Sequence, residues 1–200
     1  MRISHKHKFI FLAVPKTGST TIRRCLDSYS DIHSINDPEG PLHWHARPPE
    51  LKEYFEEQHW NWDEYFKFTF VRNPWSRAVS MYVFRGRKTI NEISIAFPGL
   101  GQWIVDCSPE NFRKYLKHKP YTTGRQMIYV NGCDFVGKIE NLQQDFNTVC
   151  DKVGIPQQQV PHKNKTKHKH YTEFYDNETR ELVAEKYAEE IEYFGYKFGE

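Results

Sequence analysis

The sequence lacks any long apolar run. Its longest purely apolar stretch covers residues 9–14, whereas a transmembrane helix needs roughly 20 such residues. The stretch is also too brief, and the region before it too short, for the pattern of a secretory signal peptide. We therefore expect no membrane span and a cytoplasmic protein.

Cysteine is scarce, with 4 residues in a chain of 200. Cys25, Cys107, Cys133 and Cys150 show neither the CxxC spacing of zinc sites nor the dense pattern of small disulfide-rich domains. No evident pair of carboxylates supplies a metal site in their place. We expect reduced thiols and no bound metal.

A strong excess of one charge is also missing, because the formal net charge is only +2 at pH 7. A nucleic-acid-binding domain usually has a strongly basic surface and a recognisable signature, and the sequence has neither. Aromatic residues make up 16% of the chain, while mean hydropathy is -0.79. This combination predicts an aromatic core under a polar surface, and no linker divides residues 1–200, so we expect a single domain.

Apolar stretches alternate with segments of helical spacing, as is typical of α/β proteins. The predicted strands cover residues 9–14, 68–71 and 134–139. The predicted helices cover residues 19–28, 49–54, 75–85, 109–116, 141–153 and 176–194. Because parallel neighbours need crossover connections, helices between the strands predict a mainly parallel sheet. Ser19 or Thr20 is expected to cap the first helix, and Asn73 with Pro74 to begin the one that follows the second strand.

A loop rich in hydroxyl side chains joins the first predicted strand to the first predicted helix. Backbone N–H groups and the positive end of the helix dipole favour an anion at such a junction, and a lysine adds a point charge. A plain strand–helix turn is the alternative. The loop lacks the GxxxxGK[ST] order of nucleotide triphosphatases, since its lysine precedes the glycine. Its residues are Pro15, Lys16, Thr17, Gly18, Ser19, Thr20 and Thr21.

A second strand–helix junction places an arginine at the carboxyl end of the strand at residues 68–71. Open α/β sheets bind ligands at this edge. Arg72 and, one helix turn beyond Arg77, Ser80 offer a guanidinium and a hydroxyl that suit a phosphate monoester. On this segment alone, a surface charge and a packing side chain are the alternative.

Together the two segments resemble the donor-binding motifs of sulfotransferases that use 3′-phosphoadenosine 5′-phosphosulfate (PAPS). PKTGSTT at residues 15–21 resembles the 5′-phosphosulfate loop of that family, and RNPWSRAVS at residues 72–80 resembles its 3′-phosphate motif RxPxxRxxS. The resemblance extends to residues 134–142 and 160–164. It is greatest to the carbohydrate sulfotransferase branch and its small bacterial relatives.

The resemblance implies a P-loop-like three-layer α/β fold with a mainly parallel central sheet flanked by helices. It also implies transfer of a sulfuryl group from PAPS to an acceptor hydroxyl, with carbohydrate as one candidate acceptor. Lys16 would contact the phosphosulfate and assist the leaving group, while Arg72 and Ser80 would bind the 3′-phosphate. Arg77 also matches the motif, but we expect it to support the structure.

Sulfuryl transfer needs a base that accepts the proton of the acceptor hydroxyl, and imidazole suits this role near neutral pH. His45 matches in position a histidine that relatives use as the base, and His43 is the reserve candidate. Pro48 and Pro49 interrupt the helical pattern that is usual at this place in relatives.

Lysine and histidine alternate in the basic segment at residues 162–170. The corresponding region of relatives folds over the donor, which implies that Asn164 and Lys165 contact the nucleotide. A solvated charged segment is the alternative, and the segment could also steer an acidic acceptor.

Two other functions compete with sulfuryl transfer. A P-loop kinase acting on a small metabolite would require ATP and magnesium, but the position of Lys16 counts against it. A non-catalytic module that binds polyanions would explain the basic segment, but it leaves both donor motifs unexplained.

Overall fold

The computed structural model describes residues 1–37, 40–89, 108–118, 124–161 and 169–200. The chain divides into two compact units, each described here by itself. The first unit comprises Met1–Arg72 and Gln126–Lys165, and the second comprises Asn73–Arg125 and Thr166–Glu200. A single domain over residues 1–200 stays a prediction.

A five-stranded sheet forms the centre of the first unit. Its strands β2, β4 and β5 are parallel, whereas β1 runs antiparallel to both β2 and β3. The prediction of a mainly parallel sheet is therefore corrected to a mixed sheet. In spatial order the strands are β3 (Ile32–His33), β1 (Arg2–Ser4), β2 (Phe9–Leu12), β4 (Phe66–Val71) and β5 (Phe135–Lys138).

The mixed character follows from the length of the first connection. Residues 5–8 alone join β1 to β2, and so short a connection permits only an antiparallel pair, since parallel strands need a crossover. Lys8 turns the chain there with a φ of 49°. The predicted strands at residues 9–14, 68–71 and 134–139 correspond to β2, β4 and β5, with shifted ends.

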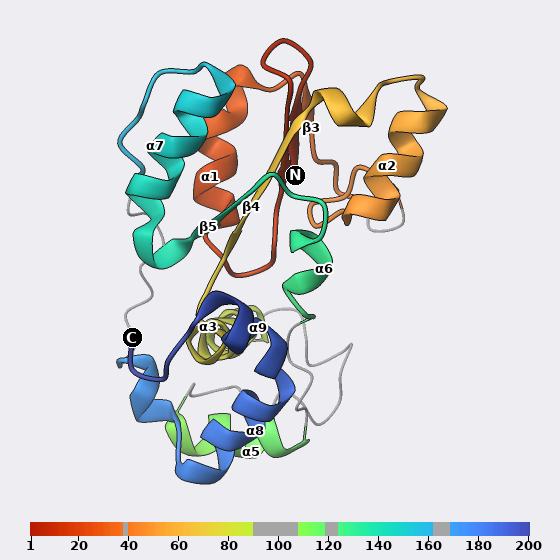
Figure 1. Cartoon of the computed structure of the whole chain (residues 1–200). Helices are drawn as coiled ribbons and strands as arrows, with labels where there is room; N and C mark the ends of the chain where they lie inside the picture. The colour runs from red at the N-terminus through yellow and green to blue at the C-terminus, as the bar shows by residue number, and fades with distance from the viewer. Residues whose placement is uncertain (38–39, 90–107, 119–123, 162–168) are drawn as a thin grey trace. The chain divides into compact units, whose positions relative to one another are not determined.

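Helices cover both faces of this sheet (Figure 1). Side chains alternate along β2, so that Phe9 and Phe11 join the core under α1 and α7, while Ile10 and Leu12 join the core that includes α2. The first unit thus has helices on both faces of the sheet, as predicted, while the P-loop-like topology stays a prediction. Its helices are α1 (Ser19–Leu26), α2 (Pro48–Glu57), α6 (Met127–Val130) and α7 (Leu142–Val153).

The second unit is helical in its described residues, with an aromatic core. Phe112 packs against Phe174 and Tyr175, with ring centroids 5.7 Å and 5.0 Å apart. The predicted helix at residues 176–194 is interrupted at Tyr187, which separates α8 from α9. The helices are α3 (Pro74–Thr89), α5 (Pro109–His118), α8 (Asn177–Lys186) and α9 (Ala188–Phe194).

The predicted start of α3 is confirmed. The side-chain oxygen of Asn73 accepts hydrogen bonds from the backbone N–H groups of Trp75 and Ser76, over 3.1 Å and 3.3 Å. Pro74 then occupies the first helical position, where its missing N–H costs nothing. Short 3-10 helices lie at Asp27–Tyr29, Trp62–Glu64, Ile139–Asn141 and Tyr171–Phe174.

Within the described ranges, no helix has the length and apolar character that crossing a bilayer would require. Three of the four cysteines lie in these ranges, and all three carry free thiols.

Candidate functional site

The predicted donor loop at residues 15–21 joins β2 to α1, as expected. The prediction that Ser19 or Thr20 caps the helix is wrong, because Gly18 is the N-cap, in the left-handed conformation with a φ of 75°. Its carbonyl accepts hydrogen bonds from the N–H groups of Thr21 and Ile22, over 2.9 Å and 3.2 Å. A cap without a side chain leaves the first N–H groups of α1 uncovered for a ligand, since those groups lack partners inside the helix.

Position 18 requires glycine for two reasons. Its positive φ disfavours any residue with a Cβ, and a Cβ there would lie 3.0 Å from Cδ1 of Ile139. Lys16 also adopts a positive φ, of 69°, which is uncommon outside glycine and often accompanies functional sites. The loop thus holds Lys16 in the left-handed conformation.

The four hydroxyls of the loop differ in their surroundings. Thr17 is fully buried and its Oγ1 donates to the carbonyl of Val14 over 3.0 Å, so this hydroxyl stabilises the loop. Ser19 and Thr21 are also buried. Thr20 is the exposed one, which makes it the loop hydroxyl most accessible to a ligand.

Arg72 follows β4 and lies beside the donor loop. Its Nη1 donates to the carbonyl of Lys16 over 3.4 Å. The side chain of Gln126 holds the backbone of Arg72 from both sides: its Oε1 accepts from the N–H of Arg72 and its Nε2 donates to the carbonyl, each over 2.9 Å. The first unit thus brings the lysine and the arginine of the two predicted motifs together.

The structure does not test the remaining predicted donor ligands. Ser80 lies half-buried on α3, in the second unit, so its pairing with Arg72 stays a prediction. Arg77 is buried and its Nη1 donates to the carbonyl of Gly124 over 2.9 Å, which fits the expected structural role. Asn164 and Lys165 lie outside the described residues.

His45 lies against the end of β2. Its Nδ1 is 2.6 Å from the carbonyl oxygen of Ala13. A carbonyl can only accept, so Nδ1 carries the proton and Nε2 presents a lone pair. The hydroxyl of Tyr129 donates to the backbone carbonyl of His45 over 3.0 Å. Burial lowers the pKa of His45 from 6.5 to about 4, with smaller contributions from positive neighbours such as Arg23.

His43 differs from His45 because both of its ring nitrogens have partners. Its Nδ1 accepts from the backbone N–H of His45, and its Nε2 donates to Glu50, both over 3.2 Å. His43 therefore orients the segment that carries His45. Pro48 and Pro49 do not disrupt a helix here, since they occupy the first two positions of α2.

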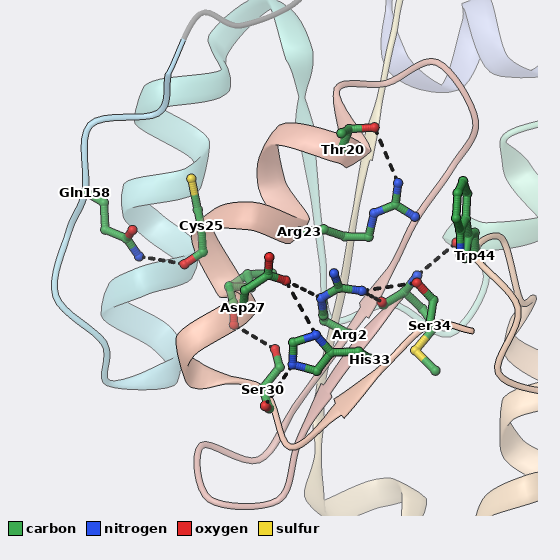
Figure 2. A network of polar contacts seen from close by, with 12 residues as sticks. Arg2, Thr20, Arg23, Cys25, Asp27, Ser30, His33, Ser34, Trp44 and Gln158 are labelled. Atoms are coloured by element: carbon green, nitrogen blue, oxygen red, sulfur yellow. Dashed lines mark hydrogen bonds and ion pairs between the residues drawn. The ribbon is translucent and has the colours of Figure 1, made fainter. Parts of the chain in front are cut away.

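Three residues that contact this site were not predicted from the sequence. Gln126 and Tyr129 come from α6 and its start, 54 and 84 residues from their partners, and no local pattern points to them. Arg23 carries a usable signal, because it lies three residues after Thr20 and hence on the same side of α1. Its Nη2 donates to Thr20 over 3.4 Å (Figure 2).

Among the residues that the structure describes, no group of three or more acidic residues, histidines or thiols is placed to bind a metal ion.

Comparison with known proteins matches residues 1–197 to the sulfotransferase family. The chain is 30% identical to carbohydrate sulfotransferase 10 of Xenopus laevis over 130 residues, 61% of this chain and 34% of that protein. It is 25% identical to carbohydrate sulfotransferase 14 of Mus musculus over 188 residues, 77% of this chain and 46% of that protein. It thus spans a third to a half of these relatives.

A shorter relative is an uncharacterized protein of Archaeoglobus fulgidus, 33% identical over 98 residues, which are 48% of this chain and 73% of that protein. No solved structure matches the chain. The predicted resemblance to carbohydrate sulfotransferases is confirmed, and because the family match spans nearly every residue, the chain belongs to the sulfotransferase family.

Proposed function

We propose that this protein transfers a sulfuryl group from PAPS to an acceptor hydroxyl, in the cytoplasm. The observation that carries the proposal is the contact between His45 Nδ1 and the carbonyl of Ala13. Ala13 lies two residues before the donor loop, so the same short segment carries the predicted phosphosulfate ligands and orients the predicted base. A base held beside a phosphosulfate loop is the arrangement that proton removal at the point of sulfuryl transfer requires.

On the donor side, cations and N–H groups would act on the charge that develops as the sulfuryl group leaves. PAPS would supply that group and would leave as adenosine 3′,5′-bisphosphate. Lys16 and the N–H groups at the start of α1 are suited to stabilise the bridging oxygen, because they are fixed before the reaction begins. Arg72, with Ser80, would bind the 3′-phosphate, and Asn164 and Lys165 would contact the nucleotide.

On the acceptor side, His45 would accept the hydroxyl proton at Nε2. With a pKa lowered to about 4, the imidazole is neutral at physiological pH and its lone pair is available. The negative charges of bound PAPS would raise this pKa and strengthen the base when the donor is present. The acceptor is proposed to be a carbohydrate, since the relatives named above are carbohydrate sulfotransferases.

Thermal stabilisation of the full chain tests the donor assignment. Adenosine 3′,5′-bisphosphate, the desulfonated product, should raise the melting temperature, whereas ATP with magnesium should not. Turnover with PAPS should also survive a chelator, because no step of the proposal uses a metal. Stabilisation by ATP with magnesium alone would favour the kinase, and stabilisation by neither nucleotide would favour a polyanion-binding module.

A further inference from the structure

Gln126 is a polar side chain without exposed surface, and it is the N-cap of α6. Burying an amide is unfavourable unless its donor and its acceptor both find partners. Both of these groups engage one residue, because Oε1 accepts from the N–H of Arg72 and Nε2 donates to the carbonyl of Arg72, each over 2.9 Å. The buried amide therefore serves the backbone of Arg72.

The consequence of this contact is a fixed main chain just beyond the sheet. β4 ends at Val71, and the amide of Gln126 extends backbone pairing to the next residue, Arg72. A carboxamide can pair with the N–H and the C=O of one residue as a neighbouring strand does, since it carries a neutral donor and an acceptor together. Fixing the backbone of Arg72 also fixes the direction in which its guanidinium leaves the sheet edge.

Tyr129 lies three residues after Gln126 and contacts the predicted base. Its N–H donates to the carbonyl of Gln126 over 2.8 Å, which closes the turn. Its ring is buried in the core that includes α2, and its hydroxyl donates to the backbone carbonyl of His45 over 3.0 Å. Because the imidazole of His45 is held separately by the carbonyl of Ala13, both the main chain and the side chain of His45 have a partner.

One helical turn thus contacts the backbones of the residues proposed to bind the 3′-phosphate and to accept the proton. We propose that Gln126 and Tyr129 are positioning residues, Gln126 for Arg72 and Tyr129 for His45. Neither would touch the donor or the acceptor, and each acts through its partner, because a small displacement of a reacting group is costly in rate. The inference rests on the proposed function and adds to it two residues that lie outside both donor motifs.

A double-mutant cycle between Gln126 and Arg72 tests the first assignment. Gln126→Met removes the amide at nearly equal side-chain length. In calorimetry on the full chain it should weaken adenosine 3′,5′-bisphosphate about three- to tenfold, the effect of a lost hydrogen bond between neutral groups. Adenosine 5′-phosphosulfate, which lacks the 3′-phosphate, should bind nearly as to the wild type. In an Arg72→Ala background, Gln126→Met should weaken neither nucleotide further.

Two results of this cycle would overturn the role of Gln126. One is an equal loss for both nucleotides, and the other is the same loss with and without the Arg72 side chain. Either would show that Gln126 supports the fold in general and does not act through Arg72.

Sulfate release from PAPS, with water as the acceptor, tests the role of Tyr129 without a known acceptor. The water oxygen bonds to sulfur, the bond from sulfur to the bridging oxygen breaks, and a water proton passes to Nε2 of His45. Tyr129→Phe removes only the hydroxyl, and it should lower kcat about three- to tenfold with an unchanged KM for PAPS. It should cost nothing further in a His45→Ala background. A change in KM alone, or an equal loss in that background, overturns the role of Tyr129.

Measurements without nucleotide separate this proposal from the donor assignment. In hydrogen exchange, the N–H of Arg72 should exchange at least about tenfold faster in Gln126→Met, while the amides of β2 keep their rates. By NMR, the Nδ1–H of His45 should exchange with water faster in Tyr129→Phe. Unchanged exchange at either position overturns the corresponding role. If both rates rise while the wild type neither binds the bisphosphate nor releases sulfate, the positioning contacts stand and the donor assignment falls.

The chain offers matched controls for both substitutions. Gln144→Met changes an exposed glutamine of α7, and Tyr193→Phe changes a tyrosine of α9 that is 66% exposed; neither should alter binding or turnover. Melting temperatures establish that the variants fold. If Gln126→Met does not fold, Gln126→Asn, which keeps the amide but is one methylene shorter, should show the same selective loss for the bisphosphate, and a loss for both nucleotides again overturns the proposal.

Discussion

The guanidinium of Arg72 donates a hydrogen bond to the backbone carbonyl of Lys16, over 3.4 Å, across 56 residues of sequence. Both residues follow parallel strands that are neighbours in the sheet, β2 and β4. The carboxyl ends of neighbouring parallel strands meet at one edge, so two cations far apart in the chain come to lie together at that edge.

Removing the side chain of Arg72 should selectively weaken the binding of nucleotides that carry a 3′-phosphate. Arg72→Ala should cost about 1.5–3 kcal/mol in binding adenosine 3′,5′-bisphosphate, as expected for one charge-assisted hydrogen bond. It should cost much less with adenosine 5′-phosphosulfate, which lacks that phosphate, while Lys16→Ala should weaken both. Calorimetry measures the affinities. Equal losses for the two nucleotides in the Arg72 variant would contradict the assignment.

Replacing His45 should stop proton removal without releasing the donor. His45→Ala should lower turnover by about 10²–10⁴-fold, the usual contribution of a positioned base, with nearly unchanged affinity for the bisphosphate. His43→Ala should cost less, because His43 only orients the segment through the N–H of His45. An inactive His43→Ala variant together with a fully active His45→Ala variant would assign the base to His43, two residues upstream.

The pH–rate profile should report the lowered pKa of His45. Protonation of Nε2 removes the lone pair, so kcat/KM should fall as the pH falls through about 4, well below the ordinary 6.5. The profile of kcat should fall at a higher pH, since bound donor charge raises the pKa. An acidic limb that persists unchanged in residual His45→Ala activity would assign the base elsewhere.

The same pKa makes stability depend on pH. As the pH falls from 6.5 toward about 4, His45 takes up a proton in the unfolded chain but not in the folded one, so the folded state loses stability. The loss is at most about 3 kcal/mol. Urea unfolding from pH 7.5 to pH 4 measures it. Because the buried amino group of Met1 also has a pKa lowered to about 4, the difference between wild type and His45→Ala isolates the histidine; identical curves would refute its burial.

Gly18→Ala should destabilise the donor loop more than Gly154→Ala destabilises the end of α7. Both glycines have a positive φ, 75° and 68°, so each substitution carries about 1–2 kcal/mol of backbone strain. Only at position 18 would the new Cβ also press on Ile139, while position 154 has open space. Urea unfolding gives the difference, and equal effects would show that Ile139 yields without cost. Adding Ile139→Val should relieve the excess in Gly18→Ala.

The longer elements could be predicted because their sequences carry strong local signals. The apolar runs of β2 and β4 and the Asn73–Pro74 start of α3 are examples. β1 and β3 span three and two residues, too few for any periodicity. The two strands that make the sheet mixed were therefore not predicted, whereas the three predicted strands are parallel to one another.

The candidate site could likewise be predicted only in part. Lys16 and Arg72 are recognisable because each follows a strand in a motif of fixed spacing. The two hydrogen bonds between the Gln126 side chain and the backbone of Arg72 are tertiary contacts, and no local sequence pattern around position 126 predicts them. The predicted cap of α1 was wrong for a different reason, because the left-handed conformation of Gly18 makes that residue the N-cap in spite of the capping propensity of Ser19 and Thr20.

The hairpin of β1 and β2 gives the donor strand a neighbour on each side. β2 pairs with β1 along one edge and with β4 along the other, and its four side chains are all fully buried. Fluctuations that fray the rim of a sheet reach an interior strand last, because both ladders must open together. The loop that follows β2 is thus attached to one of the slowest-opening parts of the first unit. Local fluctuations of the folded state therefore leave the strand that carries this loop intact.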